Sequence, residues 1–389
     1  MTHPDSRDHG PDDSRDSGGP ASRGVGSSLG ALCAHALTGV LLLVVLAWFA
    51  GRVVSDRTLT TQYLSWIPTL PVLLVAVLVT VAQLGLRTGS RTGSRVGKPR
   101  VVVPLLTSLV AAWLLLGEWR VHRAVLPSPQ RGPLRVLFMN ISPGANHASL
   151  LSLFSQDADI AVLSNVHPQP VTFEKIYGVR HQDLLEHFTG IVPGDAPPGE
   201  AHLIRSGMFH IYSKHPIRRR AAAYVANQES WIENDTGGGG SVLMLEIETP
   251  QGVRTVWAVD MPSTIGASRR SLFEQTREAI DTTTRVHAID EVGRWITFPF
   301  EADDPLRTPD IVVGDFNTPV HSWSVERFLP STRPARDDAG WGLPGTFPSQ
   351  FPLFEIDFAR LGAGARATHL TKLRAEGCRH LGLVLDLER

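Results

Sequence analysis

The sequence predicts a layered α/β sandwich preceded by three transmembrane helices. Three long apolar runs precede residue 120, and the chain beyond them alternates short β-prone runs with helical stretches. Val242–Thr249 and Val253–Val259 flank the turn Pro250-Gln251-Gly252, which predicts a hairpin. Ser268–Val292 has the mixed polar and apolar pattern of one long helix. Strands interleaved with helices in this way favour an α/β fold.

The chain divides into four predicted segments. Residues 1–30 form a tail rich in Ser, Gly, Asp, Arg and Pro, and its few apolar residues cannot offset the entropy cost of ordering. We therefore expect this tail to be disordered. Residues 31–119 form the transmembrane region, and residues 120–133 contain three prolines and form a linker. Residues 134–389 form the α/β domain.

The apolar runs have the composition of membrane spans. They are Ala31–Ala50, Trp66–Leu86 and Val101–Leu116. The first two are long enough to cross a bilayer, and the third is long enough if residues 117–119 extend it into the interface. Trp48, Trp66 and Trp119 lie near run ends, as interfacial anchors often do. The alternative is a buried helical hairpin of a soluble fold, which three nearly uncharged runs in succession disfavour.

Loop charge predicts the orientation in the membrane. Residues 87–100 contain five basic residues and no acidic one, whereas the loop between the first two runs has only Arg52 and Arg57. The positive-inside rule then places residues 87–100 and the N-terminal tail in the cytoplasm. Three spans put residues 120–389 outside. We therefore expect a multi-pass protein of the cell membrane with an extracytoplasmic C-terminal domain.

Composition bears on partners as well. The net charge is −1, so no global basic field attracts nucleic acid, and the tight basic cluster of the domain is Arg218-Arg219-Arg220. Two cysteines, Cys33 and Cys378, suggest neither a disulfide framework nor a zinc site. The expected partner is the lipid bilayer, and binding of nucleic acid is not favoured.

The run from Pro309 to Pro319 carries the most chemical information. It delivers a β-prone segment to Gly314, after which Asp315 and Asn317 follow two positions apart. In an extended segment such residues face the same side, so both can address one ligand while Phe316 packs on the other face. A carboxylate and an amide suit phosphate-ester chemistry. The alternative is an Asx-rich turn after a buried strand.

This run resembles the signature of the endonuclease/exonuclease/phosphatase superfamily, and other landmarks of the family follow in the expected order over residues 134–389. Leu134–Ile141 and Asp157–Val166 resemble its first two core strands. Gly207–Ile217 resembles its mid-domain strand and turn. The segments Ile356-Asp357-Phe358 and Cys378-Arg379-His380 resemble its last two motifs.

The resemblance implies a phosphoesterase site on an α/β sandwich. In the family a histidine of the last motif, oriented by an acidic partner, activates water, and His380 and Asp357 match these roles. Asp315 and Asn317 match the family's acid and its phosphate-orienting amide. Asn140 matches an asparagine near the family's metal ion. Catalytic roles are therefore expected for His380, Asp357, Asp315 and Asn317.

The sequence departs from the family pattern at three positions. The family's main metal ligand, a glutamate, is replaced by Asn165, and the aspartate of its last motif is replaced by Arg379. A phosphate-contacting histidine is replaced by Asp260. Magnesium prefers carboxylate oxygens, so a site built on Asn140 and Asn165 should hold it weakly.

Three accounts of these departures remain open. Arg379 can replace the cation by gripping a phosphate through its planar fork, with Asp357 and His380 as the base. Alternatively the fold has lost catalysis and binds a ligand in a polar groove. In the third account Asp260 supplies a relocated metal ligand. As substrate-binding residues we expect Arg379 and Asp260.

The chain most resembles membrane-anchored members of the superfamily, including those linked to glycopeptide (teicoplanin) resistance in actinobacteria. That resemblance implies a membrane-anchored phosphoesterase whose outward-facing domain lies near lipid headgroups, with a lipid-linked phosphate or pyrophosphate as substrate. The rival hypothesis is a catalytically degenerate binding module of the same fold. A nuclease is the third and least favoured, because it needs a basic surface of DNA size.

Overall fold

The computed structural model describes residues 25–89, 99–126, 131–141, 144–166, 170–192, 197, 200–223, 242–263 and 268–388. The predicted tail lies outside the described residues except for positions 25–30, and so do residues 90–98 of the basic loop and residues 127–130 of the predicted linker.

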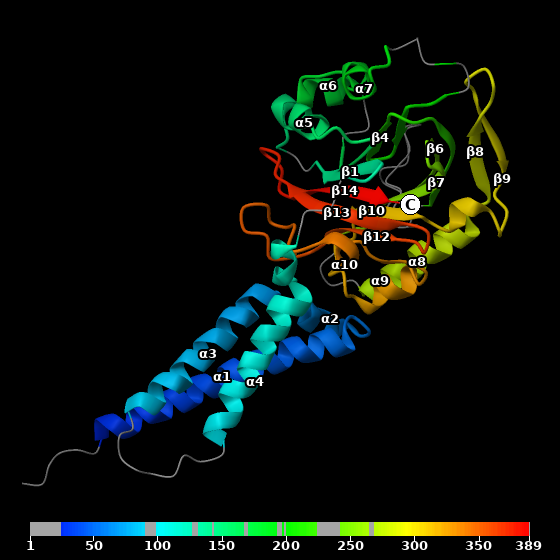
Figure 1. Ribbon diagram of the computed structural model, residues 1–389. Coiled ribbons are helices and arrows are strands. Elements are labelled where there is room, and N and C mark those ends of the chain that lie inside the picture. Colours follow the sequence, from blue (N-terminus) through cyan, green and yellow to red (C-terminus); the bar gives the residue numbers. More distant parts are fainter. Residues whose placement is uncertain are drawn as a thin grey trace, which may run out of the picture.

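Two β-sheets lie face to face in the C-terminal domain (Figure 1). The six-stranded sheet has the order β13-β14-β1-β2-β4-β3, and the eight-stranded sheet has the order β11-β12-β10-β7-β6-β5-β8-β9. The first sheet consists of β1 (Leu134–Asn140), β2 (Ile160–Ser164), β3 (Leu203–Ser206), β4 (Phe209–Ser213), β13 (Arg366–Leu373) and β14 (Gly382–Glu388). The second consists of β5 (Ile217–Ala223), β6 (Val242–Thr249), β7 (Gly252–Asp260), β8 (Arg285–Ile289), β9 (Trp295–Pro299), β10 (Ile311–Asp315), β11 (Arg333–Pro334) and β12 (Asp357–Leu361).

Helices cover the outer faces of the sheets, which confirms the predicted α/β sandwich. Those on the first sheet are α5 (His147–Phe154), α6 (Pro170–Tyr177) and α7 (His181–Thr189). Those on the second are α8 (Arg269–Thr282) and α9 (Trp323–Phe328), with α10 (Arg336–Ala339) and the 3-10 turn Pro305–Arg307 nearby. The central strands β1, β2 and β10 are apolar on both faces because each is buried between a facing sheet and a helical layer.

The predicted hairpin is confirmed, and the predicted long helix is wrong. Strands β6 and β7 pair in antiparallel fashion up to Thr249 opposite Gly252. Helix α8 ends at Thr282, and the chain continues as the hairpin β8–β9 instead of remaining helical to Val292. Three consecutive threonines, 282–284, stand at the change of structure. Their β-branched side chains disfavour the helix and favour extended backbone.

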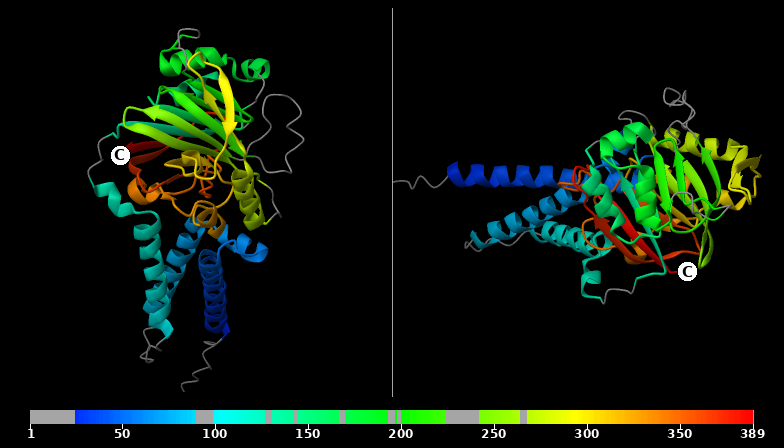
Figure 2. Two further views of the ribbon diagram at one scale, coloured as in Figure 1. Left: turned by 90° about the vertical axis from the view of Figure 1, so that its right-hand side faces the viewer. Right: turned by 90° about the horizontal axis from the view of Figure 1, so that it is seen from above.

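The N-terminal helices extend away from the domain on one side (Figure 2). They are α1 (Val25–Val54), α2 (Leu59–Ser65), α3 (Thr69–Gly89) and α4 (Pro99–Trp113), followed by the π-helical turn Leu114–Glu118 and the 3-10 turn Val121–Val125. By length and apolar composition, no single helix among the described residues qualifies as a membrane span. The segments Thr38–Val54 and Leu59–Ser65 qualify only when taken together, and they are bent by 117° relative to each other.

The helices contact the domain through polar groups. Asp56, between α1 and α2, is buried and accepts hydrogen bonds from Ser322 Oγ at 2.6 Å and from the Ser324 backbone N at 3.1 Å. Arg120 donates to Asp337 at 2.5 Å, within the segment predicted as a linker. These contacts fix the helices against α9 and α10.

Two of the three tryptophans predicted as interfacial anchors have other environments. Trp48 is 1% exposed and packs edge-on against Trp113 within the helical cluster. Trp66 follows α2 and lies beside Phe354 of the domain, with ring centroids 5.7 Å apart. The position of a tryptophan at the end of an apolar run therefore does not show whether its ring faces a membrane interface or packs inside the protein.

Candidate active site

Three aspartates lie side by side at one end of the eight-stranded sheet. Asp315, the last residue of β10, is in register with Asp260 at the end of the parallel strand β7. It is also in register with Asp357 at the start of the antiparallel strand β12. Neighbouring strands are about 4.8 Å apart, so the register gathers all three carboxyl groups. None is more than 5% exposed.

His380, in the loop before β14, is bonded to one of these aspartates. Its Nδ1 lies 2.9 Å from Asp357 Oδ2 and 3.1 Å from Asp357 Oδ1. The same nitrogen lies 3.8 Å from Asp315 Oδ2. The structure thus brings together the histidine and the acid that the last two motifs predict as partners. A carboxylate on Nδ1 fixes the ring and leaves Nε2 to exchange a proton.

Two asparagines extend this cluster toward β2. Asn165 Nδ2 donates to Asn140 Oδ1 at 3.0 Å, and Asn140 Nδ2 donates to Asp315 Oδ2 at 2.8 Å. Asn165 follows β2 directly with a left-handed backbone, φ 55°, which asparagine adopts more readily than most residues. The two predicted metal positions are therefore bonded to each other and to Asp315.

Asn317 reaches the site by a turn, so the predicted extended backbone from Asp315 to Asn317 is wrong, and the local structure is that of the alternative, an Asx turn after a buried strand. Its φ is 46°, and its backbone N donates to Asp315 Oδ1 at 2.8 Å, as in an Asx turn. Its side chain donates to Met261 O at 2.7 Å. Phe316 faces away and stacks on Phe358, with centroids 4.0 Å apart. Asp315 and Asn317 still line one cavity, because the turn carries the amide back toward the strand end.

Burial changes the acid–base properties of two carboxyl groups. Desolvation, followed by the charges of Asp357 and Asp260, raises the pKa of Asp315 well above its usual value. Desolvation is also the main reason why the pKa of Asp260 rises to about 7. Asp260 Oδ2 has no hydrogen-bond partner among the described residues. The site therefore retains protons at a pH where exposed aspartates are ionised.

The cluster opens into a cavity of about 860 Å³ between the domain and the N-terminal helices. Its domain side is lined by Asn140, Asn165, Ser263, Arg269, Asp315, Asn317, Phe347, Phe354, Ile356, Arg379 and His380. Its helical side is lined by Gln62, Tyr63, Trp66, Ile67 and Pro68 of α2 and the following turn. Sequence reasoning missed the helical side and Arg269, since no motif marks either one.

Asp260 and Arg379, both predicted to bind substrate, occupy different places. Asp260 lies beneath the cavity beside Asp315 and is 5% exposed. Arg379 lies at the surface of the cavity, with its guanidinium 5.6 Å from the centre of the Phe347 ring. The guanidinium of Arg379 is exposed and can contact a ligand in the cavity. The carboxyl group of Asp260 is buried and contributes to the charge beneath the cavity.

The residues present fit a tight magnesium site poorly. Asn140 and Asn165 offer amides that are bonded to each other, and both oxygens of Asp357 face His380 Nδ1. Within the described residues, a metal-sized group of ligand atoms is formed by Asp315, Asp357 and His380, whose atoms lie within 4.8 Å of one another. Magnesium would have to compete there with the hydrogen bond between Asp357 and His380.

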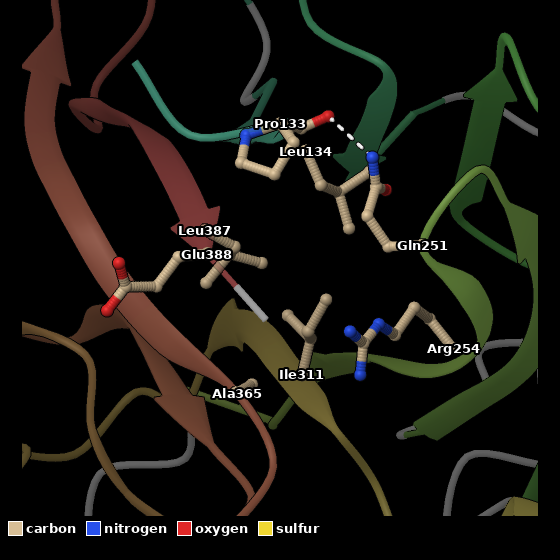
Figure 3. Close-up of a pocket in the computed structure, with 8 residues that line it drawn as sticks. All are labelled: Pro133, Leu134, Gln251, Arg254, Ile311, Ala365, Leu387 and Glu388. Carbon is tan, nitrogen blue, oxygen red and sulfur yellow. Dashed lines mark hydrogen bonds between the residues drawn. The ribbon is translucent and has the colours of Figure 1, made fainter. Parts of the chain in front are cut away.

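A much smaller cavity lies at the opposite end of β10 (Figure 3). Leu134, Ile311 and Leu387 contribute apolar side chains to it, and Gln251 Nε2 donates to Pro133 O at 3.5 Å across its rim. Its volume of about 10 Å³ is at most that of one water site. It is therefore too small to bind a substrate.

No family model matches the sequence, and no curated protein matches it. Among solved structures, a mannosyl-6-phosphatase of Bacteroides thetaiotaomicron is 15% identical with a TM-score of 0.42, over 65% of this chain and 99% of that chain. A sphingomyelinase C of Streptomyces griseocarneus is 12% identical with a TM-score of 0.41, over 65% and 98%. An endonuclease/exonuclease/phosphatase protein of Beutenbergia cavernae is 17% identical with a TM-score of 0.41, over 66% and 72%. The chain is thus similar, at low identity, to solved structures of endonuclease/exonuclease/phosphatase proteins.

Proposed function

We propose that this protein is a phosphoester hydrolase that acts at a membrane surface. The observation that carries the proposal is the contact between His380 Nδ1 and Asp357 in a cavity also lined by Asp315 and Asn317. A histidine oriented by a carboxylate is suited to remove a proton from water. A buried carboxyl group with a raised pKa is suited to give a proton to a leaving oxygen.

The geometry supports the following roles in this mechanism. With its Nδ1 proton held by Asp357, His380 accepts a proton from water through Nε2, and the water oxygen attacks phosphorus. Asp315, whose pKa is raised by burial, protonates the leaving-group oxygen. Asn317 positions a phosphoryl oxygen from the same cavity. Because the donor set suits magnesium poorly, no step of this mechanism passes through a metal ion.

Membrane attachment through residues 31–119 is part of the proposal. The helices carry large apolar side chains on their surface, among them Leu43, Leu46, Phe49, Leu78, Val81 and Leu109, all more than half exposed. Such a surface is costly in water and favourable in lipid. The basic residues of loop 87–100 favour a cytoplasmic loop and an outward-facing domain.

A lipid-linked phosphate or pyrophosphate is the proposed substrate class. The cavity combines polar residues at the sheet end with the apolar side chains of Trp66 and Ile67 on its helical side. An amphiphile can place its phosphate on the first and its hydrocarbon on the second. Nucleic acid fits less well, because Arg218 and Arg219 of the basic cluster pair with Glu248 and Glu246.

The test is a panel of phosphoesters offered to the purified full chain in detergent micelles. We expect turnover of a phosphoester without added divalent cation, and a higher kcat/KM for a lipid-linked phosphate than for its water-soluble headgroup. Tight binding of a phosphoester with no turnover of any would favour the rival hypothesis, a binding module. That rival is supported by Asn165 and Arg379, which leave the site two carboxylates short of the family pattern.

A further inference from the structure

Arg269 is a buried cation on the wall of the candidate site. It is the first residue of α8, it is 4% exposed, and it lines the same cavity as Asp315 and His380. Its Nη1 donates to Pro262 O at 2.6 Å. Its Nε is buried, and among the described residues it has no acceptor. A buried donor without an acceptor is costly, so the position calls for a ligand that accepts hydrogen bonds.

Among the described residues, no ion pair neutralises the charge of Arg269. Burial lowers the pKa of Arg269, while the charges of Asp315 and Asp56 raise it. A guanidinium remains protonated near neutral pH even so. The Nη1 of Arg269 is bonded to a backbone carbonyl rather than to a carboxylate, and Asp56 already accepts hydrogen bonds from Ser322 and Ser324. A buried cation of this kind favours an anion beside it.

Helix α2 holds Arg269 in place from the helical side of the cavity. Gln62 Oε1 accepts a hydrogen bond from the Arg269 backbone N at 2.9 Å, although the two residues are 207 positions apart. The Trp66 ring centre lies 5.7 Å from the guanidinium carbon, within the range of a cation–π contact. The guanidinium is therefore presented to the cavity by both parts of the molecule.

We propose that Arg269 is the anion-binding residue of this site and that its planar fork grips the phosphoryl oxygens of the substrate. The inference rests on the proposed function and adds a residue and a ligand chemistry to it. A guanidinium binds phosphate through two parallel hydrogen bonds, so it supplies both charge and orientation. The predicted metal positions Asn140 and Asn165 carry no carboxylate and should hold a metal ion weakly. The guanidinium of Arg269 supplies the positive charge in place of that ion.

A purely structural role for Arg269 makes a different prediction. If the residue only joins α8 to α2, its replacement lowers stability and leaves anion binding in the folded protein unchanged. Arg270 is the matched control. It is adjacent to Arg269, it is exposed, and its guanidinium pairs with Glu274 one turn further along α8. It does not line the cavity of the candidate site.

The experiment titrates inorganic phosphate into the full chain in detergent micelles and follows the heat of binding. We expect Arg269→Gln to weaken phosphate binding by about tenfold or more, and Arg269→Lys to weaken it by a few-fold because the fork is lost. Arg270→Gln should bind as the unmodified chain does. Phosphate affinity that is unchanged in folded Arg269→Gln overturns the inference. If that variant does not fold, unchanged affinity in Arg269→Lys overturns it.

Turnover separates this inference from the proposed function. If the unmodified chain hydrolyses a phosphoester and folded Arg269→Gln has the same KM and phosphate affinity, the function stands and the role of Arg269 fails. If the unmodified chain hydrolyses nothing yet binds phosphate in a manner that depends on Arg269, the anion site stands and the hydrolase fails. A rise in KM for Arg269→Lys, with no rise for Arg270→Gln, supports both.

Discussion

Asp260 and Asp315 are register partners at the ends of the parallel strands β7 and β10, and both are buried. Two carboxyl groups this close do not ionise independently, because the first negative charge opposes the second. The pair therefore holds a proton at a pH where an exposed aspartate has already lost its own. Part of the desolvation cost falls on Asp260, whose buried Oδ2 has no hydrogen-bond partner within the described part of the chain.

The first prediction concerns pH and stability. The pKa of Asp260 is about 7 in the folded protein, against an ordinary value of 3.8. Below the lower value the group is protonated in both states and costs nothing. As pH rises toward 7 the unfolded chain releases the proton first, so the folded protein loses stability, on the order of a few kcal/mol in all. Above 7 the cost is constant.

Asp260→Asn should remove this part of the pH dependence, since asparagine is neutral throughout. Thermal unfolding between pH 5 and pH 8 measures it, with exposed Asp303→Asn as the control. We expect a flatter profile for Asp260→Asn and an unchanged one for the control. Equal slopes in Asp260→Asn and the unmodified chain would contradict the raised pKa of Asp260.

The second prediction concerns the histidine and its partner. His380→Ala and Asp357→Asn should each lower kcat by about 10²- to 10⁴-fold, because the first removes the proton acceptor and the second removes the carboxylate that orients it. The double variant should lose little more than the worse single one, since the two residues act as a unit. Steady-state kinetics on a soluble phosphoester would show this. Full turnover by folded His380→Ala would exclude the mechanism.

The third prediction concerns magnesium. The unmodified chain should bind it weakly, and Asn165→Glu should bind it more tightly by adding a carboxylate beside Asn140. The left-handed backbone at residue 165 costs a longer side chain about 1 kcal/mol. Asn165→Gln carries the same cost without the charge and is the control. Tight magnesium binding by the unmodified chain in calorimetry would refute the expectation.

The fourth prediction concerns orientation in the membrane. Reporter fusions at residue 94 and residue 389 should report opposite sides, with residue 94 in the cytoplasm, because loop 87–100 carries five basic residues and no acid. Two cytoplasmic reporters would mean that the third apolar run does not span. Two extracytoplasmic reporters would mean that the charge rule fails for this chain.

The fifth prediction concerns the contact between the helices and the domain. Asp56→Ala removes the acceptor for Ser322 Oγ and the Ser324 backbone N, so stability should fall by about 1–3 kcal/mol. The loosened α2 should also raise KM for a phosphoester. Asp337→Ala also removes a contact between the helices and the domain, but at Arg120 and not beside α2, whose residues line the cavity, so KM should stay unchanged in this control. A stable Asp56→Ala protein with normal KM would show that α2 is held without this contact.

The sequence predicted those parts of the structure that follow from a local pattern of residues. The apolar runs around Val136, Val162 and Val313 predicted central strands, because a strand buried on both faces is apolar throughout. The last two motifs brought Asp357 and His380 together on resemblance alone. Their roles, and that of the metal positions, stay predictions.

Other features had no local signal. At Asn317 the sequence left an extended segment and an Asx turn both open, since asparagine accepts extended and left-handed backbone, and the structure has the turn. Helix α2 and Arg269 were missed because their contact joins positions 207 apart and involves an ordinary glutamine. The cavity wall is a product of tertiary packing, which neither periodicity nor motif spacing records.

Helix α2 and the turn after it form one side of the cavity, and this has a practical consequence for anyone who shortens the chain. A fragment that begins at residue 120 keeps Asp315, Asp357 and His380 but lacks Tyr63, Trp66 and Ile67. Its proposed catalytic groups would then be open to solvent on one side. Inhibitor screens run on such a fragment would select compounds for a shape that the intact protein does not offer, and would overlook those that fit against Trp66.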